Sequence, residues 1–557
     1  MIQIFCKNTN TAKSFPEGIS LLEILSEFEF DRPWPIVSAK VNNVSQGLKY
    51  RAYHSHDVEF LDVRETSGMG VYVRSLSFLL CKAAEDVLHG CKVYIEHPIS
   101  NGYFCNIHKE DRSQVTAADI AAIADRMRTI VSMDMPFRRF EVPAAEAVRI
   151  FSEKGYADKV ALLETGDDVY SHYYMLGDSA DYYYGRLLPS AGYLTVWGLE
   201  PYHEGVLLRI PDHNNPAQLA PFTDEPLTFG IFSENLRWNI IMGLANVGDV
   251  NKACRSGRAS ELIQVAEALQ EKKIVQIAEE IDRRMRSVEN PLKAVLITGP
   301  SSSGKTTFSK RLEIQLKACG LTPVTISTDD YFVNRVETPL FPDGSYDFDN
   351  FETVDYKLLE RDVVRMMAGE EVEVPNYNFV TGQREYNGRR CALSQGSVLI
   401  IEGIHALNPR LLPNVAPSST YKIFINTITS TSLDSHNTIP TSDNRLLRRI
   451  IRDYDKGAFT AQQTIAQWAK VCAAEEKWIL PYRENADVMF NSSYLIEFAV
   501  LRLHAERILA TVPKNTPEYC EAHRLAHFLH YFTPVPDKEI PPTSLLREFI
   551  GGNSFNV

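Results

Sequence analysis

The feature that most constrains this chain is a short glycine- and serine-rich run between an apolar stretch and a helical one. Residues 294–297 are apolar, and residues 299–307 read GPSSSGKTT. The run fits G-x-x-x-x-G-K-[ST], the pattern of a phosphate-binding P-loop. Such a loop needs a strand before it and a helix after it, and the apolar spacing of residues 308–316 predicts that helix.

Each part of this loop has an expected task. Small residues let successive backbone N–H groups surround an anion, and the positive end of the following helix points at the same place. We expect Lys305 to reach the outer phosphates of ATP and Thr306 to ligate Mg²⁺. The residues expected to hold the nucleotide are Gly299, Ser301, Ser302, Ser303, Gly304, Lys305, Thr306 and Thr307.

Length and composition place limits on the rest of the chain. With 557 residues it is too long for one core, so three or four domains are expected. Its net charge of −13 argues against a general nucleic-acid-coating surface. Nine scattered cysteines favour a reducing compartment, and neither a bilayer-length apolar run nor a secretory leader is present. We therefore predict a cytoplasmic protein with no membrane partner; the sequence leaves its oligomeric state open, with a homo-oligomer among the alternatives.

The pattern of apolar residues separates three parts of the chain. Residues 1–65 alternate strand-like and helical pieces, and 226–290 turn helical and form a connector. Residues 66–225 lie between these parts, and a resemblance given below implies an α+β domain there. Residues 291–557 read as α/β with a helical tail, because apolar strands alternate with helical stretches as in a parallel sheet.

Two carboxylates follow strands of the predicted parallel sheet, at the edge where ligands bind in such sheets. Asp329 follows the strand at 323–327, where it could accept the proton of an attacking hydroxyl. Its plain alternative is a turn or helix-cap aspartate. Glu402 ends the strand at 397–401, in a place where an acid can hold Mg²⁺ directly or through water.

Two further stretches carry candidate groups for the substrate and the transition state. The acidic and aromatic loop 344–355 could offer a carboxylate to sugar hydroxyls. In the helical stretch 443–453, arginines recur at three- and four-residue steps, which suits the charge on transferring phosphate oxygens. A solvated basic face is the alternative for that stretch.

Together these stretches resemble one family, the uridine kinase and phosphoribulokinase group of P-loop kinases, over roughly residues 291–500. The residues that carry the resemblance are GPSSSGKTTFSKRL, STDDYF, YDFDNFETVD, PNYNF, IIEGIHALNP and DNRLLRRIIRD. The resemblance implies that Asp329 is the base, Asp349 the ribose-hydroxyl carboxylate and Tyr377 an aromatic of the substrate pocket. It implies that Arg445, Arg448 and Arg449 are lid arginines. From their places in the same motifs, we assign Asp330, Tyr331 and Arg384 to the acceptor pocket.

One departure from that family concerns the acceptor. Uridine-cytidine kinases carry a histidine that touches the pyrimidine in the motif Y-D-F-x-T-H-x-R, and this chain has Gly382 at the matching position. A glycine offers no ring nitrogen to a base edge. A nucleoside acceptor is therefore expected, with uridine specificity open and with a sugar or another small alcohol as the alternative.

The N-terminal parts resemble other modules. FPEGISLLEIL, AKVNN and DVEFLDV resemble the TGS domain, a ubiquitin-like β-grasp module, and residues 66–225 resemble the second additional domain of threonyl-tRNA synthetases. That domain hydrolyses mischarged tRNA with His and Cys residues. The matching positions here are Arg74, Phe78, Tyr183 and Leu187, which cannot do that work. We expect a retained scaffold used for packing or assembly, or else for RNA binding.

The whole layout resembles a bacterial group of uridine kinase-like nucleoside kinases. It implies an ATP- and Mg²⁺-dependent phosphotransferase that acts on a primary hydroxyl, the 5′-OH of a nucleoside. The rival from another class is an ATP-gated RNA-binding protein that uses the synthetase-like half. The acidic charge and the lost editing residues count against this rival.

Overall fold

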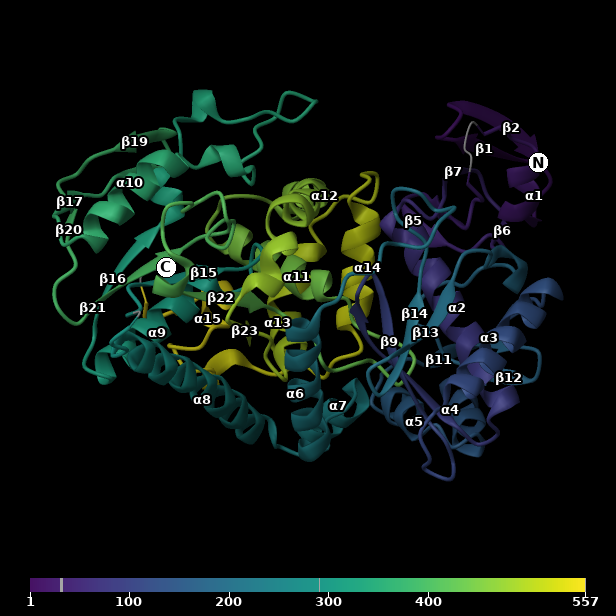
Figure 1. Cartoon of the computed structure of the whole chain (residues 1–557). Coiled ribbons are helices and arrows are strands. Elements are labelled where there is room, and N and C mark those ends of the chain that lie inside the picture. The colour runs from purple at the N-terminus through teal and green to yellow at the C-terminus, as the bar shows by residue number, and fades with distance from the viewer. Residues whose placement is uncertain (31–33, 290, 556–557) are drawn as a thin grey trace.

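The computed structural model of the chain describes residues 1–30, 34–289 and 291–555. Its two halves lie side by side (Figure 1): the N-terminal half is purple and blue, and the P-loop half runs from teal to yellow. None of the helices in the described ranges has the length and apolar character that crossing a membrane requires.

The P-loop half is built on a five-stranded parallel sheet with the order β16-β21-β15-β22-β23. Its strands are β15 (Ala294–Thr298), β16 (Thr322–Ser327), β21 (Ser397–Glu402), β22 (Thr420–Asn426) and β23 (Val488–Asn491). The three strands predicted from the sequence are β15, β16 and β21, so the predicted α/β class with a parallel sheet is confirmed.

Helices cover both faces of this sheet. They include α6 (Pro226–Met242), α8 (Ala259–Met285), α9 (Lys305–Ala318) and α10 (Tyr356–Met367). Val295 and Ile297 of the central strand belong to one apolar cluster with α8 and α9. Ala294 and Leu296 belong to another with α6 and α10. Because neighbouring residues of a strand point to opposite faces, a strand covered on both sides is apolar throughout.

The rest of the P-loop half consists of helices and small hairpins. The helices are α11 (Thr441–Asp455), α12 (Ala461–Trp478), α13 (Glu497–Leu509), α14 (Tyr519–Leu529) and α15 (Arg547–Ile550). β17 (Val372–Glu373) pairs with β20 (Arg390–Cys391), and β18 (Asn376–Asn378) pairs with β19 (Gln383–Glu385). These hairpins belong to the stretch expected to bind the acceptor.

The first part of the N-terminal half is a mixed sheet with the order β2-β1-β7-β4-β5. Its strands are β1 (Ile2–Cys6), β2 (Thr11–Phe15), β4 (Ser38–Val41), β5 (Val44–Gln46) and β7 (His56–Leu61). β1 and β7 are parallel. Helix α1 (Leu21–Ser26) buries Leu21 and Ile24 in the same core, and β3 (Ile19–Ser20) pairs with β6 (Arg51–Ala52). One helix on such a sheet matches the expected β-grasp module.

The second part combines helices with two antiparallel sheets. One sheet has the order β13-β14-β9-β8, with β8 (Lys92–Ile99), β9 (Gly102–His108), β13 (Gly198–Tyr202) and β14 (Gly205–Arg209). The other contains β10 (Phe137–Pro143), β11 (Tyr170–Leu176) and β12 (Ser179–Asp181). The helices are α2 (Thr66–Val87), α3 (Ala117–Ser132), α4 (Ala144–Glu153) and α5 (Ala157–Glu164). This part therefore has the α+β character expected of an editing-like domain.

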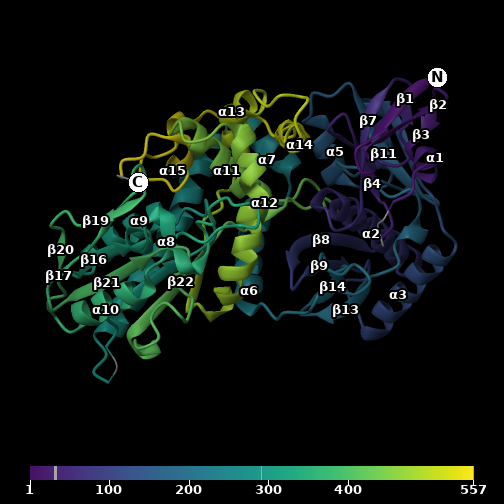
Figure 2. The same ribbon diagram turned by 90° about the horizontal axis from the view of Figure 1, so that it is seen from above.

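The two halves share buried surface. One apolar cluster contains residues of α4 and α5, of the connector helix α7 (Val247–Arg255), and of α11, α13, α14 and α15. Seen from above, α12 runs between the sheet of the P-loop half and the N-terminal half (Figure 2). The boundaries predicted at 65, 225 and 290 divide the sequence into parts, but the packing crosses them.

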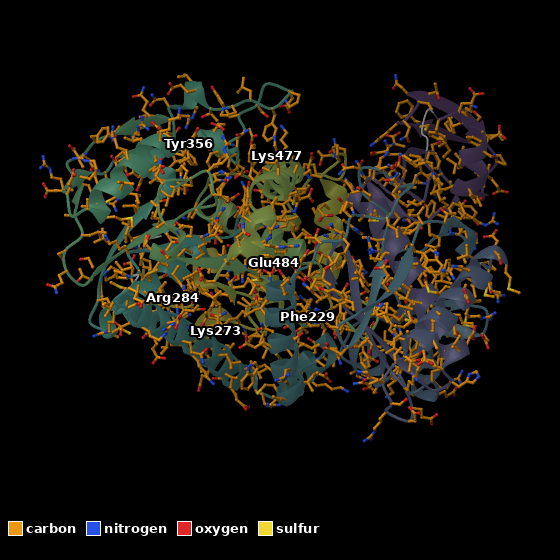
Figure 3. The ribbon with its side chains drawn as sticks, viewed as in Figure 1. Phe229, Lys273, Arg284, Tyr356, Lys477 and Glu484 are labelled. Atoms are coloured by element: carbon orange, nitrogen blue, oxygen red, sulfur yellow. The ribbon has the colours of Figure 1, made fainter. Side chains whose placement is uncertain are left out.

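Helix α6 contacts both halves at its N-terminus. The ring of Phe229 stacks on His203 at 3.8 Å between centroids and meets Phe104 edge-on at 5.0 Å. Glu484, from the P-loop half, accepts hydrogen bonds from the backbone N–H groups of Leu227 and Thr228, the orphan donors at a helix start. Phe229 and Glu484 both lie at this junction (Figure 3). We therefore regard α6 as a structural link between the halves.

Candidate active site at the phosphate-binding loop

The register of the parallel sheet brings three predicted groups to one edge. Glu402, the last residue of β21, lies opposite Ile297 of β15 and Ser327 of β16. The P-loop begins two residues after Ile297, and Asp329 lies two residues after Ser327. Gly403 makes this convergence possible, because a Cβ there would lie 1.7 Å from Thr328 Oγ1. The P-loop, the predicted base and the predicted metal acid therefore share the carboxyl edge of the sheet.

The P-loop has the shape that an anion requires. Ser302 and Gly304 have φ angles of +59° and +85°, and helix α9 begins directly afterwards at Lys305. Left-handed residues in such a loop turn successive N–H groups toward one point. The buried hydroxyls of Ser302 and Ser303 have no hydrogen-bond partner within the described ranges. The residues present thus fit a nucleotide phosphate, with Lys305 and half-buried Thr306 at the mouth.

Electrostatics show that Asp329, Glu402 and Lys305 influence one another. Burial raises the pKa of Asp329, and the Lys305 ammonium opposes that rise. Burial raises the pKa of Glu402 to about 7; Lys305 lowers it, and the Asp329 and Glu548 carboxylates raise it further. Acids whose charge is not fully compensated by the protein are suited to a metal ion or to a proton from a substrate.

The predicted acceptor residues have different environments. Burial raises the pKa of Asp349 to about 6, Arg449 opposes this, and Glu475, Asp347 and Asp329 add to it. The buried hydroxyl of Tyr377 has no hydrogen-bond partner in the part of the chain that the structure describes. Asp349 and Tyr377 therefore keep polar atoms available for a ligand.

Two of the other predicted acceptor residues already have structural partners, and the third is buried. Asp330 pairs with Arg389 at 3.3 Å, and Arg384 pairs with Asp355 at 2.9 Å. Tyr331 is fully buried in the apolar cluster beneath. Their assignment as substrate contacts stays a prediction, and their present partners indicate that they shape the pocket.

The three arginines of α11 that were predicted to belong to a lid are buried or half-buried. Arg448 is fully buried and forms an ion pair with Glu497, and its guanidinium lies 3.4 Å from the Ser302 carbonyl oxygen. Arg445 is buried and pairs with Glu475 at 2.6 Å. Both groups thus brace the P-loop from behind.

Arg449 differs from these two. It is half-buried and donates a hydrogen bond of 3.1 Å to the Ser301 hydroxyl at the loop. Of the three, Arg449 is the one that the structure leaves beside the predicted phosphate position. The catalytic assignment of all three stays a prediction.

The Gly382 departure has a structural explanation. Gly382 lies in the turn between β18 and β19 with a φ angle of +71°. A Cβ at this position would lie 2.8 Å from both Cβ and Nε of Arg335. Arg335 also donates hydrogen bonds to the Phe379 carbonyl and from its own backbone to Gly382. The Arg335 side chain therefore occupies the space into which a residue-382 side chain would project.

Sequence reasoning missed the acids that contact the loop. Glu475 of α12 accepts a hydrogen bond of 2.7 Å from the Ser301 backbone N–H, and Glu548 of α15 accepts one of 3.1 Å from Thr307. They lie 174 and 241 residues beyond their partners, and neither belongs to a motif that we recognised. No local pattern pointed to them.

In the editing-like region, three of the four positions predicted to match the family's His and Cys residues lie in the apolar core, and the fourth is Arg74. Phe78 packs against Tyr183 at 5.5 Å between ring centroids, and Tyr183 and Leu187 are buried in the same core. The Arg74 guanidinium lies over the Tyr184 ring. Phe78, Tyr183 and Leu187 thus belong to the apolar core of this part.

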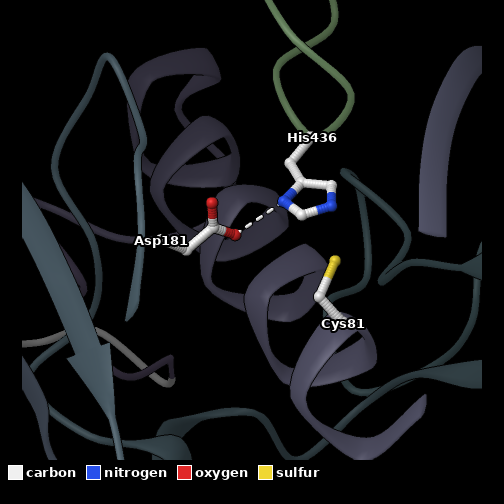
Figure 4. A group of neighbouring side chains, drawn as sticks. All are labelled: Cys81, Asp181 and His436. Carbon is white, nitrogen blue, oxygen red and sulfur yellow. Dashed lines mark hydrogen bonds and ion pairs between the residues drawn. The ribbon is translucent and has the colours of Figure 1, made fainter. Parts of the chain in front are cut away.

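A buried polar cluster lies one turn further along α2 (Figure 4). His436, from the loop before α11, hydrogen-bonds Asp181 through Nδ1 at 2.7 Å and the Val93 carbonyl through Nε2 at 3.1 Å. Cys81 lies beside them, and its Sγ, a His436 nitrogen and an Asp181 oxygen lie within 4.8 Å of one another. The Lys159 ammonium is 2.9 Å from both Asp181 and Asp434.

This cluster fits a structural contact between the two halves better than a metal site. Both ring nitrogens of His436 are used, and Lys159 already supplies a positive charge to the carboxylates. Burial would raise the pKa of Asp181, but His436 and Lys159 hold it well below its ordinary value. Burial would lower the pKa of Lys159, but Asp181 and Asp434 raise it. Lys159 thus pairs with both carboxylates, although burial raises the pKa of Asp434.

Comparison with known proteins separates the two halves. Residues 294–495 match the model of the phosphoribulokinase/uridine kinase family. The uridine kinase of Mycoplasma genitalium is 29% identical over 225 residues, 40% of this chain and 96% of that protein. The threonine–tRNA ligase of Carboxydothermus hydrogenoformans is 26% identical over 191 residues, 34% of this chain, and the match spans only 30% of the ligase's length.

Among solved structures, D-glycerate 3-kinase from Cryptococcus neoformans is 15% identical with a TM-score of 0.26, covering 38% of this chain and 89% of that one; this score is too low to bear on the fold. The family match and the intact P-loop agree with the kinase motifs found in the sequence, and the ligase similarity belongs to the N-terminal part. Residues 294–495 are therefore a domain of the phosphoribulokinase/uridine kinase family, joined to an N-terminal part similar to threonine–tRNA ligases.

Proposed function

We propose that this chain is an ATP- and Mg²⁺-dependent phosphotransferase that transfers the γ-phosphoryl group to a primary hydroxyl, the 5′-OH of a nucleoside of the uridine or cytidine type. The observation that carries the proposal is the strand register that puts Asp329 and Glu402 at the edge where the P-loop begins. Phosphoryl transfer needs positioning and charge neutralisation more than covalent chemistry, and this edge supplies both.

Each residue of the edge has one task in this proposal. Lys305 and the loop amides bind the phosphates, and Arg449 neutralises charge on the transferring group. Asp329 accepts the proton of the acceptor hydroxyl while the oxygen of that hydroxyl bonds to the γ-phosphorus. The bond between the γ-phosphorus and the oxygen that leaves with ADP breaks. Thr306 and Glu402 would hold Mg²⁺, which supplies charge neutralisation when bound.

The acceptor pocket supports a polyhydroxylated substrate with a planar ring. Asp349 can accept hydrogen bonds from hydroxyls when ionised. The rings of Phe332, Tyr377 and Phe379 lie 5.1 to 6.2 Å apart and form an aromatic wall. A nucleoside combines both features. Arg335 beside Gly382 changes the end of this wall where uridine-cytidine kinases have histidine, so a sugar or another small alcohol is the competing acceptor class.

A screen of ATP consumption over nucleosides, sugars and small alcohols tests the proposal. We expect turnover with a pyrimidine nucleoside and none with Lys305→Ala. Turnover only with a sugar would keep the kinase and replace the nucleoside. If no hydroxyl compound stimulates ATP consumption above the Lys305→Ala background, the proposed function is wrong.

A further inference from the structure

The segment 541–555, which we call the strap, packs against the P-loop. It contains α15, and Figures 1 and 2 both place α15 beside α9. Leu545 is buried in the apolar cluster of α9, while Leu546, Phe549 and Ile550 are buried in the cluster shared with α11. These apolar contacts hold the polar residues of the strap over the loop.

Two polar side chains of the strap converge on one P-loop residue. Glu548 accepts a hydrogen bond of 3.1 Å from the Thr307 backbone N–H. Asn553 donates one of 3.1 Å to the Thr307 hydroxyl. Thr307 is in the first turn of α9, whose free N–H groups are the donors that a P-loop uses for phosphate. A carboxylate of the chain thus uses a donor that a nucleotide phosphate would need.

Glu548 also influences Glu402 electrostatically. Its carboxylate is among the charges that raise the pKa of Glu402. An anion near Glu402 opposes the ionised form of that acid, and a nucleotide arriving with Mg²⁺ would meet both carboxylates.

The other acid on the loop is held differently. Glu475 contacts the Ser301 N–H but is buried in an ion pair with Arg445, so its position is part of the framework. Glu548 is half-buried, and no ion pair within the described ranges includes it. Moving Glu548 away therefore breaks one charge-assisted hydrogen bond and leaves no buried cation unpaired.

We propose that the strap competes with the nucleotide for the P-loop, with Glu548 as the competing anion. It rests on the proposed function only in taking the P-loop as the nucleotide site. A triphosphate carries more charge than one carboxylate, so the strap lowers the apparent affinity and does not abolish binding. The apparent dissociation constant rises as the fraction of chains with a free loop falls.

Calorimetric titration of the full chain with ADP and Mg²⁺ measures this competition. We expect Glu548→Gln to bind ADP about tenfold more tightly, because a charge-assisted hydrogen bond to the loop is weakened. Asn553→Ala should tighten binding about threefold. The matched control is Glu539→Gln, an exposed glutamate of the adjoining stretch, which should match the wild type.

Hydrogen exchange gives a second measurement on the unmodified chain. ADP with Mg²⁺ should increase amide exchange in residues 545–555 as the strap leaves the loop. Unchanged or weaker ADP binding by Glu548→Gln would overturn the proposal, as would exchange in 545–555 that ADP leaves unchanged or reduces. Weaker binding would show that Glu548 contacts the nucleotide.

These outcomes are separate from those of the kinase proposal. Tighter ADP binding by Glu548→Gln without phosphorylation of any acceptor would keep the strap and remove the kinase. If the chain phosphorylates a nucleoside but the wild type and Glu548→Gln bind ADP equally well, the kinase proposal stands and the strap proposal is wrong.

Discussion

The buried polar cluster at the junction of the halves and the buried acids at the P-loop edge differ in their ion pairs within the described ranges. At the junction of the halves, Lys159 and His436 offset the carboxylates around them, and both ring nitrogens of His436 are used. At the P-loop edge, Asp329, Glu402 and Asp349 all have raised pKa values. Buried charge is costly unless it is compensated. Buried carboxylates that pair with a cation of the chain favour a structural role, whereas buried carboxylates without such a pair favour a place for a ligand.

The largest expected effect tests whether the acids at the P-loop edge take part in catalysis. Asp329→Asn should lower kcat by about 10³-fold, the range for loss of a general base, because the amide cannot take the hydroxyl proton. ADP affinity should stay within about threefold of wild type, since the P-loop is untouched. Steady-state kinetics with calorimetry measures both. A wild-type rate in Asp329→Asn would contradict the base assignment.

The next effect tests whether the polar cluster at the junction of the halves is purely structural. Lys159→Met removes the cation between Asp181 and Asp434 and should cost about 3–5 kcal/mol of unfolding free energy, because buried carboxylates lose their partner. Denaturant titration measures the loss. Lys252→Met is the control, since its pair with Glu164 is about half exposed and 3.7 Å long. If Lys159→Met had the same unfolding free energy as Lys252→Met, the cluster would not stabilise the fold.

The pH dependence of acceptor binding sharpens the comparison further. Asp349 has a pKa of about 6, so its ionised fraction falls about tenfold between pH 7 and pH 5, and the acceptor KM should rise about tenfold in that window. Asp349→Asn should flatten this dependence, whereas exposed Asp343→Asn should not. An unchanged pH profile in Asp349→Asn would exclude Asp349 from acceptor binding.

The same shift affects stability with a defined sign. The folded-state pKa of Asp349 lies above its ordinary value, so its contribution favours the folded chain below about pH 4. That contribution is lost as the pH rises through about 6. The ionised form of Asp349, which can accept hydrogen bonds from an acceptor, therefore makes the folded state less stable.

The smallest expected effect concerns the turn between β18 and β19, where Arg335 lies against Gly382. Arg335→Ala should raise the acceptor KM about threefold, with kcat near wild type, because one side chain that borders the aromatic wall is removed. Arg390→Ala, an exposed arginine of β20, is the control. Initial-rate kinetics with the preferred acceptor measures the change. A fall in kcat without a change in KM would show that Arg335 acts on the chemistry instead.

Local patterns predicted much of the fold. The P-loop, its flanking strand and helix, and the strands at 323–327 and 397–401 are all expected from the sequence, because apolar runs and turn chemistry act over a few residues. The convergence of Lys305, Asp329 and Glu402 also followed from general rules, since parallel strands end at one edge.

Long-range packing determines features that the sequence patterns did not indicate. The arginine spacing of α11 suggested one basic face, but helices and the loop surround α11, so Arg445 and Arg448 are buried and form ion pairs with Glu475 and Glu497. Gly382 read as a lost side chain, but its space is filled by Arg335 from 47 residues earlier in the chain. Such partners depend on which surfaces meet, and no periodicity encodes that.

The sequence by itself predicted a phosphate-binding loop, a candidate base and a candidate metal-binding acid, because each depends on residue types at short spacing. Only the tertiary structure decided which charges are sealed by partners and which remain available. It also decided that the strap contacts the P-loop. Electrostatic compensation depends on distance in space and on the exclusion of water, and both are set by contacts between residues hundreds of positions apart.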